Sequence, residues 1–224
     1  MASKNHTTLA VVATLAAASV GYYLYRRSQQ KSSKKTVVFV LGGPGAGKGT
    51  QCDKIISTYP SFKFFSAGDL LRAERKKEGS KVGEMINQKI ANGEFVPASV
   101  TVRLLKDAMD SCPPGSKFLI DGFPRNLDNV NVWEEILASE CDVKFCLFLD
   151  CPEGIMIERI LERGKTSGRN DDNIETLRKR FRNFEKDTIP IVQSFEKTGK
   201  LRKVKADRAV EKVFEEVKLL FEGV

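Results

Sequence analysis

The sequence predicts an α/β protein in which helices cover both faces of a parallel sheet. Three short runs, 36–41, 117–121 and 143–150, are almost continuously hydrophobic, as expected of strands buried on both sides. A fourth, less hydrophobic strand is expected at 200–206. Stretches with helical periodicity separate these runs, and strands that alternate with helices are joined by right-handed crossovers into a parallel sheet.

The predicted helices lie between and around these strands. Their hydrophobic residues recur at the three- and four-residue spacing of an amphipathic helix. They cover residues 48–58, 69–91, 98–110, 127–139, 153–163, 172–197 and 208–222. A chain of 224 residues can bury a full core. We expect an N-terminal segment, 1–35, followed by one folded domain, 36–224.

The positive charge of the chain lies mainly in the N-terminal segment. The formal net charge is +8, and residues 1–35 hold six basic residues and no acidic one. The remaining 189 residues hold 31 basic and 29 acidic residues. A protein with a basic nucleic-acid-binding surface throughout is therefore disfavoured, and no nucleic-acid partner is expected.

Histidine and cysteine usage excludes several kinds of site. The only histidine, His6, lies in the N-terminal segment, which excludes a Ser-His-Asp triad, a histidine base and a histidine-ligated metal in the folded domain. The five cysteines are odd in number, and no two of them have the two-residue gap of a zinc or redox motif. We expect reduced thiols in a reducing compartment.

An uncharged stretch of seventeen residues, 9–25, precedes the folded domain. As a helix it would be about 25 Å long, slightly short for a hydrocarbon core of about 30 Å. Three tyrosines near its end and the basic residues after it suit a membrane interface that faces the cytosol. The alternative is a buried or disordered alanine-rich tail. We expect a cytoplasmic monomer, with an organelle-membrane anchor through residues 9–25 as the second interpretation.

A glycine-rich motif follows the first strand and opens a helix. It reads GGPGAGKGT over residues 42–50, with four residues between Gly42 and Gly47 and a lysine next. This is the spacing of a phosphate-binding loop, in which glycines let backbone N–H groups approach phosphate oxygens and the lysine reaches the terminal phosphates. The motif predicts a three-layer P-loop NTPase fold. The ATP-binding candidates are Gly45, Ala46, Gly47, Lys48, Gly49 and Thr50.

Two residues are candidates for a magnesium site. Gly49 stands where a phosphate-binding loop usually carries serine or threonine after its lysine, and the hydroxyl group comes one residue later, at Thr50. Asp121 ends a hydrophobic strand, like the aspartate that holds magnesium in many P-loop enzymes. We expect Mg²⁺, carried in with ATP, to be held by Asp121 through water, with Thr50 as a second candidate. Capping of the following turn is the alternative role for Asp121.

Four motifs together resemble the nucleoside monophosphate kinases, the adenylate kinase family. They are GGPGAGKGTQ, SAGDLLR at 66–72, DGFPRN at 121–126 and RGKTSGRNDD at 163–172, in the order and spacing of that family. The resemblance covers residues 36–222 and is closest to the branch that uses UMP and CMP. It implies phosphoryl transfer from ATP to UMP, CMP and dCMP in pyrimidine nucleotide metabolism.

The resemblance assigns basic residues to the phosphate groups. Arg72, Arg125, Arg169 and Arg180 would contact the acceptor monophosphate and the transferred group, and Arg163 would contact ATP, with Arg159 as its neighbour. The catalytic candidates are Lys48, Arg125, Arg163, Arg169 and Arg180. A guanidinium group suits this task because it can donate two parallel hydrogen bonds to two phosphate oxygens. The acceptor phosphate is anionic, so no general base is required.

The resemblance also implies two mobile parts. Residues 66–95 would close over the acceptor, and residues 164–171 would form a short lid that excludes water. The main chain at Arg208 would meet the adenine of ATP. The residues implied for the acceptor are Arg72, Glu94, Phe95, Val96, Gly122, Phe123, Pro124, Arg125, Asn129, Arg169 and Arg180.

Two positions favour a pyrimidine acceptor by resemblance. Ala67 stands where adenylate kinases usually carry threonine, and Asn129 stands where they carry glutamine. The Asn129 amide can bond uracil in one orientation and cytosine when flipped. Adenine offers the same edge as cytosine, so an adenylate kinase is the first alternative. A nucleotide-binding module without kinase activity is the second, although the chain lacks an NKxD guanine-binding motif.

Overall fold

The computed structural model describes residues 34–91, 96–165 and 174–224. Residues 35–224 form a compact unit, separate from residues 1–34. The predicted membrane segment at 9–25 lies outside the described residues. None of the helices within the described ranges is both long enough and apolar enough to cross a membrane.

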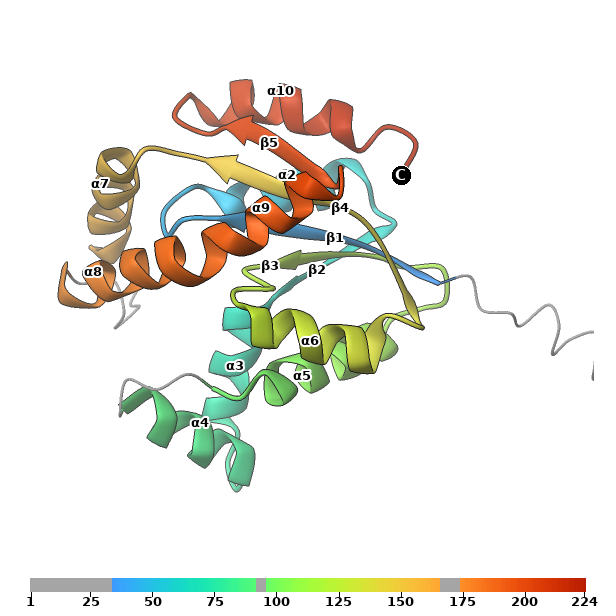
Figure 1. The fold of residues 1–224 in the computed structure, drawn as a ribbon, viewed down its shortest axis with the longest axis vertical. Coiled ribbons are helices and arrows are strands. Elements are labelled where there is room, and N and C mark those ends of the chain that lie inside the picture. The colour runs from blue at the N-terminus through green and yellow to red at the C-terminus, as the bar shows by residue number, and fades with distance from the viewer. Residues whose placement is uncertain (1–33, 92–95, 166–173) are drawn as a thin grey trace, which may run out of the picture. The chain divides into compact units, whose positions relative to one another are not determined.

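A five-stranded parallel sheet forms the centre of the compact unit (Figure 1). Its strand order is β2-β3-β1-β4-β5, so β1 lies in the middle. The α/β class and the four predicted strands are confirmed, and β3 has the predicted bounds. The strands are β1 Lys35–Gly42, β2 Phe62–Ser66, β3 Lys117–Asp121, β4 Cys141–Asp150 and β5 Leu201–Lys205.

The sequence pattern did not indicate β2. This strand lies at the edge of the sheet and pairs only with β3. Its sequence is FKFFS, in which Phe62 is buried and Lys63 is exposed. A five-residue edge strand needs no continuous hydrophobic run, because only part of it is covered, and its pattern is therefore weak.

Helices were predicted at the correct places, with two differences in how they are divided. In the described residues they are α2 Lys48–Thr58, α3 Ala67–Lys76, α4 Lys81–Ala91, α5 Ala98–Asp110, α6 Leu127–Leu137, α7 Glu153–Gly164, α8 Ile174–Asn183, the π segment η1 Phe184–Thr188, α9 Ile189–Lys197 and α10 Val210–Leu220.

The single helix predicted at 69–91 is in fact two helices, α3 and α4. Between them Gly79 has a φ of 70°, which side chains other than glycine rarely adopt. The Ser80 hydroxyl accepts a hydrogen bond of 2.9 Å from the N–H of Gly83 and caps the start of α4. The adjacent glycine and serine were a local stop and start signal that the helical periodicity obscured.

The single helix predicted at 172–197 contains a π turn. The N–H of Ile189 bonds to the carbonyl oxygen of Phe184, five residues earlier. Pro190 follows at once, and it has no N–H for an ordinary helical bond. The wider turn accommodates this loss and changes the face that the helix presents. Such turns are frequent at functional sites.

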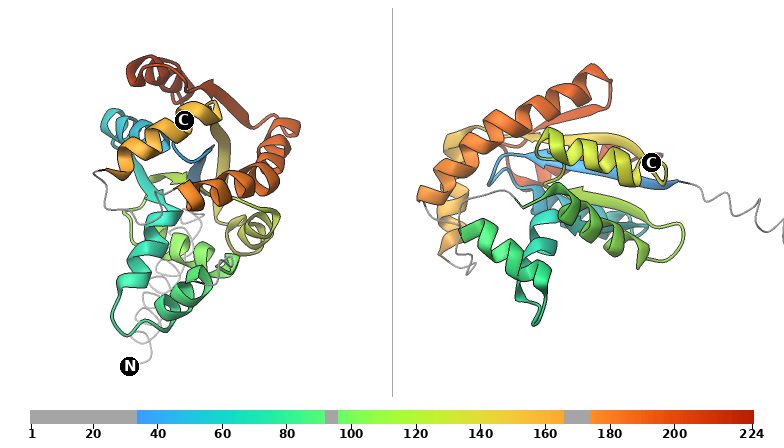
Figure 2. Two further views of the ribbon diagram at one scale, coloured as in Figure 1. Left: turned by 90° about the vertical axis from the view of Figure 1, so that its left-hand side faces the viewer. Right: turned by 60° about the horizontal axis from the view of Figure 1, so that its bottom comes forward.

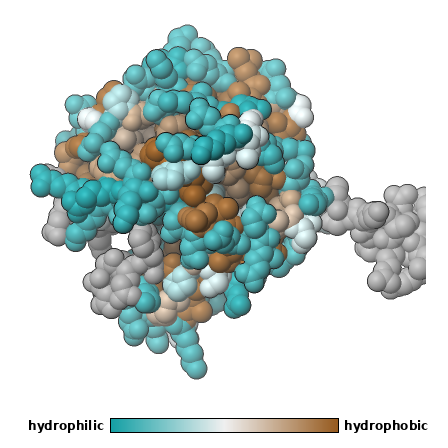
Figure 3. Space-filling view, viewed as in Figure 1, coloured by the Kyte–Doolittle hydropathy of each residue, from teal (hydrophilic) through white to brown (hydrophobic). Residues whose placement is uncertain are grey.

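Alternate residues of β1 face two separate hydrophobic layers. Val38 and Val40 belong to the layer covered by α2, α7 and α10. Val37, Phe39 and Leu41 belong to the layer covered by α5, α6 and α9. The two groups of helices enclose the sheet in Figures 1 and 2. Hydrophilic residues cover most of the face shown in Figure 3.

A network of four charged side chains lies at the amino end of β1. The Lys35 ammonium lies 2.5 Å from Asp110 and 3.1 Å from Glu140, and Lys106 lies 3.0 Å and 2.9 Å from the same carboxylates. The hydrogen bond from Lys106, followed by that from Lys35, lowers the pKa of Glu140. The hydrogen bonds to Glu140 and Asp110 raise the pKa of Lys106. The network joins β1, α5 and the start of β4.

We predict that Glu140→Gln lowers the free energy of unfolding by about 1 kcal/mol or less, since these side chains are partly exposed and screened by solvent. The pKa of Glu140 is lower in the folded state, so its contribution is present above the ordinary pKa of 4.5 and is lost as the pH falls through the lowered value. Urea unfolding of the wild type and of Glu140→Gln, at low and high salt, measures the difference in the free energy of unfolding. The difference from wild type should shrink at 1 M salt, whereas Glu135→Gln, an exposed change on α6, should have no effect.

Candidate functional site

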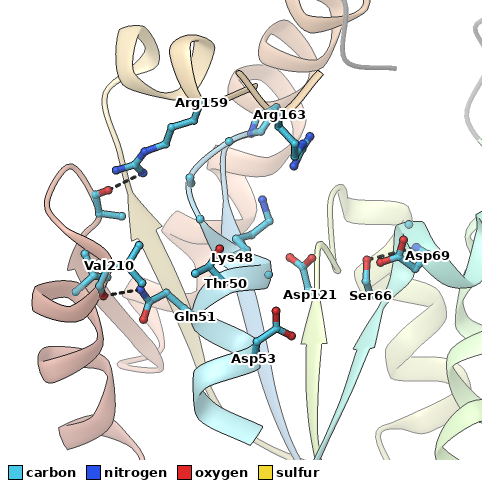
Figure 4. Close-up of a pocket in the computed structure, with 18 of the residues that line it drawn as sticks. Lys48, Thr50, Gln51, Asp53, Ser66, Asp69, Asp121, Arg159, Arg163 and Val210 are labelled. Atoms are coloured by element: carbon cyan, nitrogen blue, oxygen red, sulfur yellow. Dashed lines mark hydrogen bonds between the residues drawn. The ribbon is translucent and has the colours of Figure 1, made fainter. Parts of the chain in front are cut away.

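The carboxyl ends of β1, β2 and β3 meet at one edge of the sheet, above which lies the main cleft. The central strand β1 has β3 and β2 on one side and β4 and β5 on the other, so the strand order reverses beside it. Parallel sheets bind ligands at such a topological switch point, at the carboxyl ends of the strands. The cleft has a volume of about 620 Å³. The glycine-rich loop, α2, α3, α7, α8 and the β5–α10 loop contribute its walls (Figure 4).

The glycine-rich loop passes very close to α7. Gly45 has a φ of 83°, and a Cβ atom there would lie 2.4 Å from the carbonyl oxygen of Met156. A Cβ atom at Gly43 would lie 2.4 Å from the sulfur of the same residue. Glycine is therefore required at Gly45 for both conformation and space, whereas at Gly43 a larger residue would displace the flexible end of the Met156 side chain. The loop leads directly into α2, whose first N–H groups lie at the cleft and favour an anion.

Lys48, the first residue of α2, turns back over the loop. Its ammonium group donates to the carbonyl oxygens of Gly42 and Gly43, at 2.9 and 3.0 Å. Burial lowers its pKa, Asp121 acts in the opposite direction, and Arg125 and Arg180 lower the pKa further. An ammonium group has three N–H donors, so one remains for a ligand in the cleft.

Asp121 ends β3 and faces the cleft beside Lys48 and Thr50 (Figure 4). One of its carboxylate oxygens, Oδ1, is buried without a hydrogen-bond partner. Buried polar atoms are nearly always partnered, so this atom points to a ligand. Within the described ranges no three His, Cys, Asp or Glu residues are grouped to hold a metal. A hydrated divalent cation that also takes oxygens from a nucleotide fits this donor set.

Two guanidinium groups meet at the amino end of α3. A Cβ atom at Gly68 would lie 3.3 Å from Nη1 of Arg72 and 3.7 Å from Nη2 of Arg125. The Arg72 group is held by Asp69, with Nη2 and Nε at 2.5 and 3.1 Å from Oδ1. Two cations at a helix N-terminus form a site for an anion such as a phosphate.

Arg125 itself is held by the loop that follows β3. Its Nε donates to the carbonyl oxygen of Gly122 at 2.6 Å, and its main-chain N–H donates to Oδ1 of Asn129 at 3.0 Å. Gly122 has a φ of 69°, and a Cβ atom there would lie 2.8 Å from the Arg125 guanidinium group. The loop thus sets the guanidinium group directly against its own backbone.

The opposite side of the cleft is formed by α7 and the β5–α10 loop. Arg163 lies in the last turn of α7 and lines the cleft, and Arg159 one turn earlier donates to the carbonyl oxygen of Ala206 at 2.9 Å (Figure 4). The Arg208 guanidinium group pairs with Glu216 of α10 at 2.7 Å. The side chain of Arg208 is therefore occupied by a contact within the protein.

Most of the predicted site residues line this one cleft. They are Gly45, Ala46, Gly47, Lys48, Gly49, Thr50, Arg72, Asp121, Arg125, Arg163, Arg180 and Arg208. Gly122 lines a smaller adjoining pocket of about 130 Å³. Glu94, Phe95, Arg169 and most of the predicted lid lie outside the described residues.

Four described residues of the predicted site do not line the cleft: Val96, Phe123, Pro124 and Asn129. Phe123 packs in the core against Phe39 and Trp133. The buried Asn129 accepts the main-chain bond of Arg125 through its carbonyl oxygen, the only amide atom that can accept from an N–H group. The flip of this amide between two bases, which the sequence analysis considered, would break that bond.

Several cleft residues were missed. Gln51 is buried, and its Nε2 donates to the carbonyl oxygen of Val210 at 3.0 Å, which joins α2 to α10 (Figure 4). Asp69 orients Arg72 from within the same predicted motif, where an acid three residues before an arginine was an available signal. The contact of Gln51 joins residues far apart in sequence and had no local signal.

Known proteins with similar sequences support the predicted resemblance. A family model described as adenylate kinase matches residues 40–200. The UMP-CMP kinase of Gallus gallus is 51% identical over 193 residues, which are 84% of this chain and 98% of that protein. The UMP-CMP kinase of Homo sapiens is 49% identical with the same coverage. The uridylate kinase of Saccharomyces cerevisiae is 50% identical over 184 residues, 81% of this chain and 88% of that protein.

We predict that Gly45→Ala weakens ATP binding by at least about tenfold, because the new methyl group meets the main chain of α7 and occupies an unfavourable φ. Titration with ATP by calorimetry measures the affinity. Gly154→Ala is the matched control, since Gly154 lies on α7 with open space around it. Equal ATP affinity of the two variants would contradict the packing argument.

Proposed function

Because the chain belongs to the adenylate kinase family, we propose that it transfers the terminal phosphoryl group of ATP to UMP, CMP or dCMP, giving ADP and a pyrimidine nucleoside diphosphate. The observation that carries this proposal is the presence of two anion sites in one cleft. One is the glycine-rich loop with Lys48, and the other is the pair of guanidinium groups at the start of α3. A nucleotide-binding module without kinase activity would need only the first.

In this proposal the two anion sites hold the two reacting nucleotides. The loop and Lys48 bind the phosphates of ATP, while Arg72 and Arg125 bind the acceptor phosphate. Arg163 and Arg180 enter the cleft from α7 and α8 and meet the transferred group, with Arg169 as a further contact. The transition state spreads charge over the moving phosphoryl group, so positioned cations supply most of the catalysis.

Magnesium, carried in with ATP, fits the acidic side of the cleft. Asp121 has an unpartnered buried oxygen, and Thr50 offers a hydroxyl beside it. Asp121 would hold the hydrated ion through water, and Thr50 would be a second ligand. When bound, the ion neutralises phosphate charge in the transition state.

The chain's residues need not remove a proton. The nucleophile is an oxygen of the acceptor phosphate, which is already anionic near neutral pH. Water is the competing acceptor, and closure of residues 66–95 and 164–171 over the cleft would exclude it. The main chain at Arg208 would contact the adenine of ATP. The guanidinium group of Arg208 would not take part, since it pairs with Glu216.

A pyrimidine acceptor is favoured over AMP by the names of the relatives, UMP-CMP kinase and uridylate kinase. We assign the base contact to the NH₂ group of Asn129, because its carbonyl oxygen holds Arg125. Asn129 does not line the cleft of the described structure, so this contact needs the acceptor site to rearrange when the nucleotide binds. This group is a donor, and both pyrimidines offer acceptors, O4 in uracil and N3 in cytosine. A single orientation of the amide can therefore serve both bases. Glu94, Phe95 and Val96, together with the main chain of Phe123 and Pro124, would complete the acceptor site.

Location and assembly belong to the same proposal. We propose a monomer that works in the cytoplasm and has no nucleic-acid partner. Attachment to an organelle membrane through residues 9–25 is the alternative, and the basic residues that follow this stretch support it.

We predict that UMP and CMP are better acceptors than AMP by at least about 100-fold in kcat/KM, since a site that bonds one base edge leaves buried polar groups unpaired with another. A coupled assay of ADP formation with each monophosphate, and with none, measures this. Equal rates with AMP would favour the adenylate kinase alternative. ADP formation that does not depend on any monophosphate would overturn the kinase assignment.

Lys48→Met should lower kcat by about 100- to 1,000-fold, because it removes a positive charge aimed at the transferred phosphates. Thermal unfolding should stay close to wild type. Lys54→Met is the control on the same helix, since Lys54 pairs with Glu211 of α10 at 2.8 Å and does not line the cleft. A Lys48→Met enzyme with more than half of the wild-type rate would refute the assignment of the loop.

A further inference from the structure

Thr188, the last residue of the π segment, contacts the loop that carries Arg125. Its hydroxyl donates a hydrogen bond of 2.9 Å to the main-chain carbonyl oxygen of Arg125, 63 residues away in sequence. The residue is only 6% exposed. A threonine within a helix usually bonds to a carbonyl three or four residues earlier. This hydroxyl instead reaches another element, so its bond is a tertiary contact.

The main chain of Arg125 is thereby held from two sides. Asn129 of α6 accepts from its N–H group at 3.0 Å, and Thr188 donates to its carbonyl oxygen. The Nε atom bonds to Gly122 at 2.6 Å. Loss of the Thr188 hydroxyl would leave the carbonyl oxygen of Arg125 without this bond and free the loop to shift.

The same helical run carries Arg180. Residues 174–197 form α8, the π turn and α9 without interruption, so Arg180 and Thr188 belong to one body. Arg125, Arg180, Lys48 and Thr188 also line the same small pocket of about 130 Å³. The Thr188 bond therefore links the helix that carries one arginine to the loop that carries the other.

Thr188 is the last residue of the π turn. The turn contains an extra residue compared with an α-helical turn, so the residues after it face a different direction. Leu177 of α8 packs in one hydrophobic layer and Ile191 of α9 packs in the other. The run crosses from one layer to the other between Phe181 and Phe184, and Thr188 follows four residues after Phe184.

We propose that Thr188 is a positioning residue for phosphoryl transfer, whose hydroxyl holds Arg125 in register with Arg180, so that one guanidinium group meets the acceptor phosphate while the other meets the transferred phosphoryl group. The inference rests on the proposed function. Thr188 contacts neither nucleotide and acts through Arg125. Its loss should reduce stabilisation of the transition state more than binding of ATP, because the ATP phosphates are held by the separate loop with Lys48.

The test compares Thr188→Val, which removes the hydroxyl at nearly constant volume, with Thr188→Ser, which retains it. Thr188→Val should lower kcat/KM for UMP and CMP about tenfold, the effect of one buried polar group left unsatisfied. Its ATP affinity, measured by calorimetry, should stay within about twofold, and Thr188→Ser should recover most of the rate. Thr101→Val is the control, since Thr101 is 8% exposed on α5 and does not line the cleft.

A double-mutant cycle with Arg125→Lys separates positioning from a general structural effect. If Thr188 acts through Arg125, Thr188→Val should lower kcat/KM little further in the Arg125→Lys background. The same tenfold loss in both backgrounds, or an unchanged rate for Thr188→Val alone, would overturn the inference. If Thr188→Val does not unfold cooperatively, Thr188→Ala against Thr188→Ser provides the same comparison. A wild-type enzyme inactive with UMP and CMP would instead refute the proposed function.

Discussion

Repulsion between cations is the constraint on which the candidate site depends. Burial lowers the pKa of Lys48, Asp121 acts in the opposite direction, and the nearby Arg125 and Arg180 lower the pKa further. Main-chain carbonyl groups hold much of this charge in place: Gly42 and Gly43 accept from Lys48, and Gly122 accepts from Arg125. A carbonyl group orients a cation without cancelling its charge. Arg72, in contrast, is paired with the carboxylate of Asp69.

The parallel sheet brings these groups together, because the chain reaches the same edge at the end of every strand. The glycine-rich loop follows β1, Ser66 caps α3 after β2, and Asp121 ends β3. Two helix N-termini, those of α2 and α3, consequently lie at the cleft. The close approach of Gly43 and Gly45 to Met156 adds α7, and with it Arg159 and Arg163, to the same wall.

Asn129 and Thr188 both hold Arg125, although neither residue lies in one of the four sequence motifs. Both bind the main chain of Arg125, one at its N–H group and the other at its carbonyl oxygen. For Asn129 this contact uses the carbonyl oxygen, which leaves the NH₂ group for the proposed contact with the base. Thr188 ends the π turn before Pro190, and its hydroxyl bonds to Arg125 and not to a carbonyl group of its own helix.

The sequence by itself determined the α/β class, four of the five strands, the glycine-rich loop and the strand-end aspartate, while the family resemblance supplied the arginines of the cleft. These are local signals, since a hydrophobic run, a glycine spacing or a strand-end aspartate can be recognised from neighbouring residues. Only the tertiary structure decided that β2 completes the sheet edge, that Asn129 and Thr188 hold Arg125, and that Arg208 pairs with Glu216. An edge strand is stabilised by its partner, and a hydrogen bond over 63 residues exists only after the helices have packed, so neither leaves a pattern in the adjacent residues.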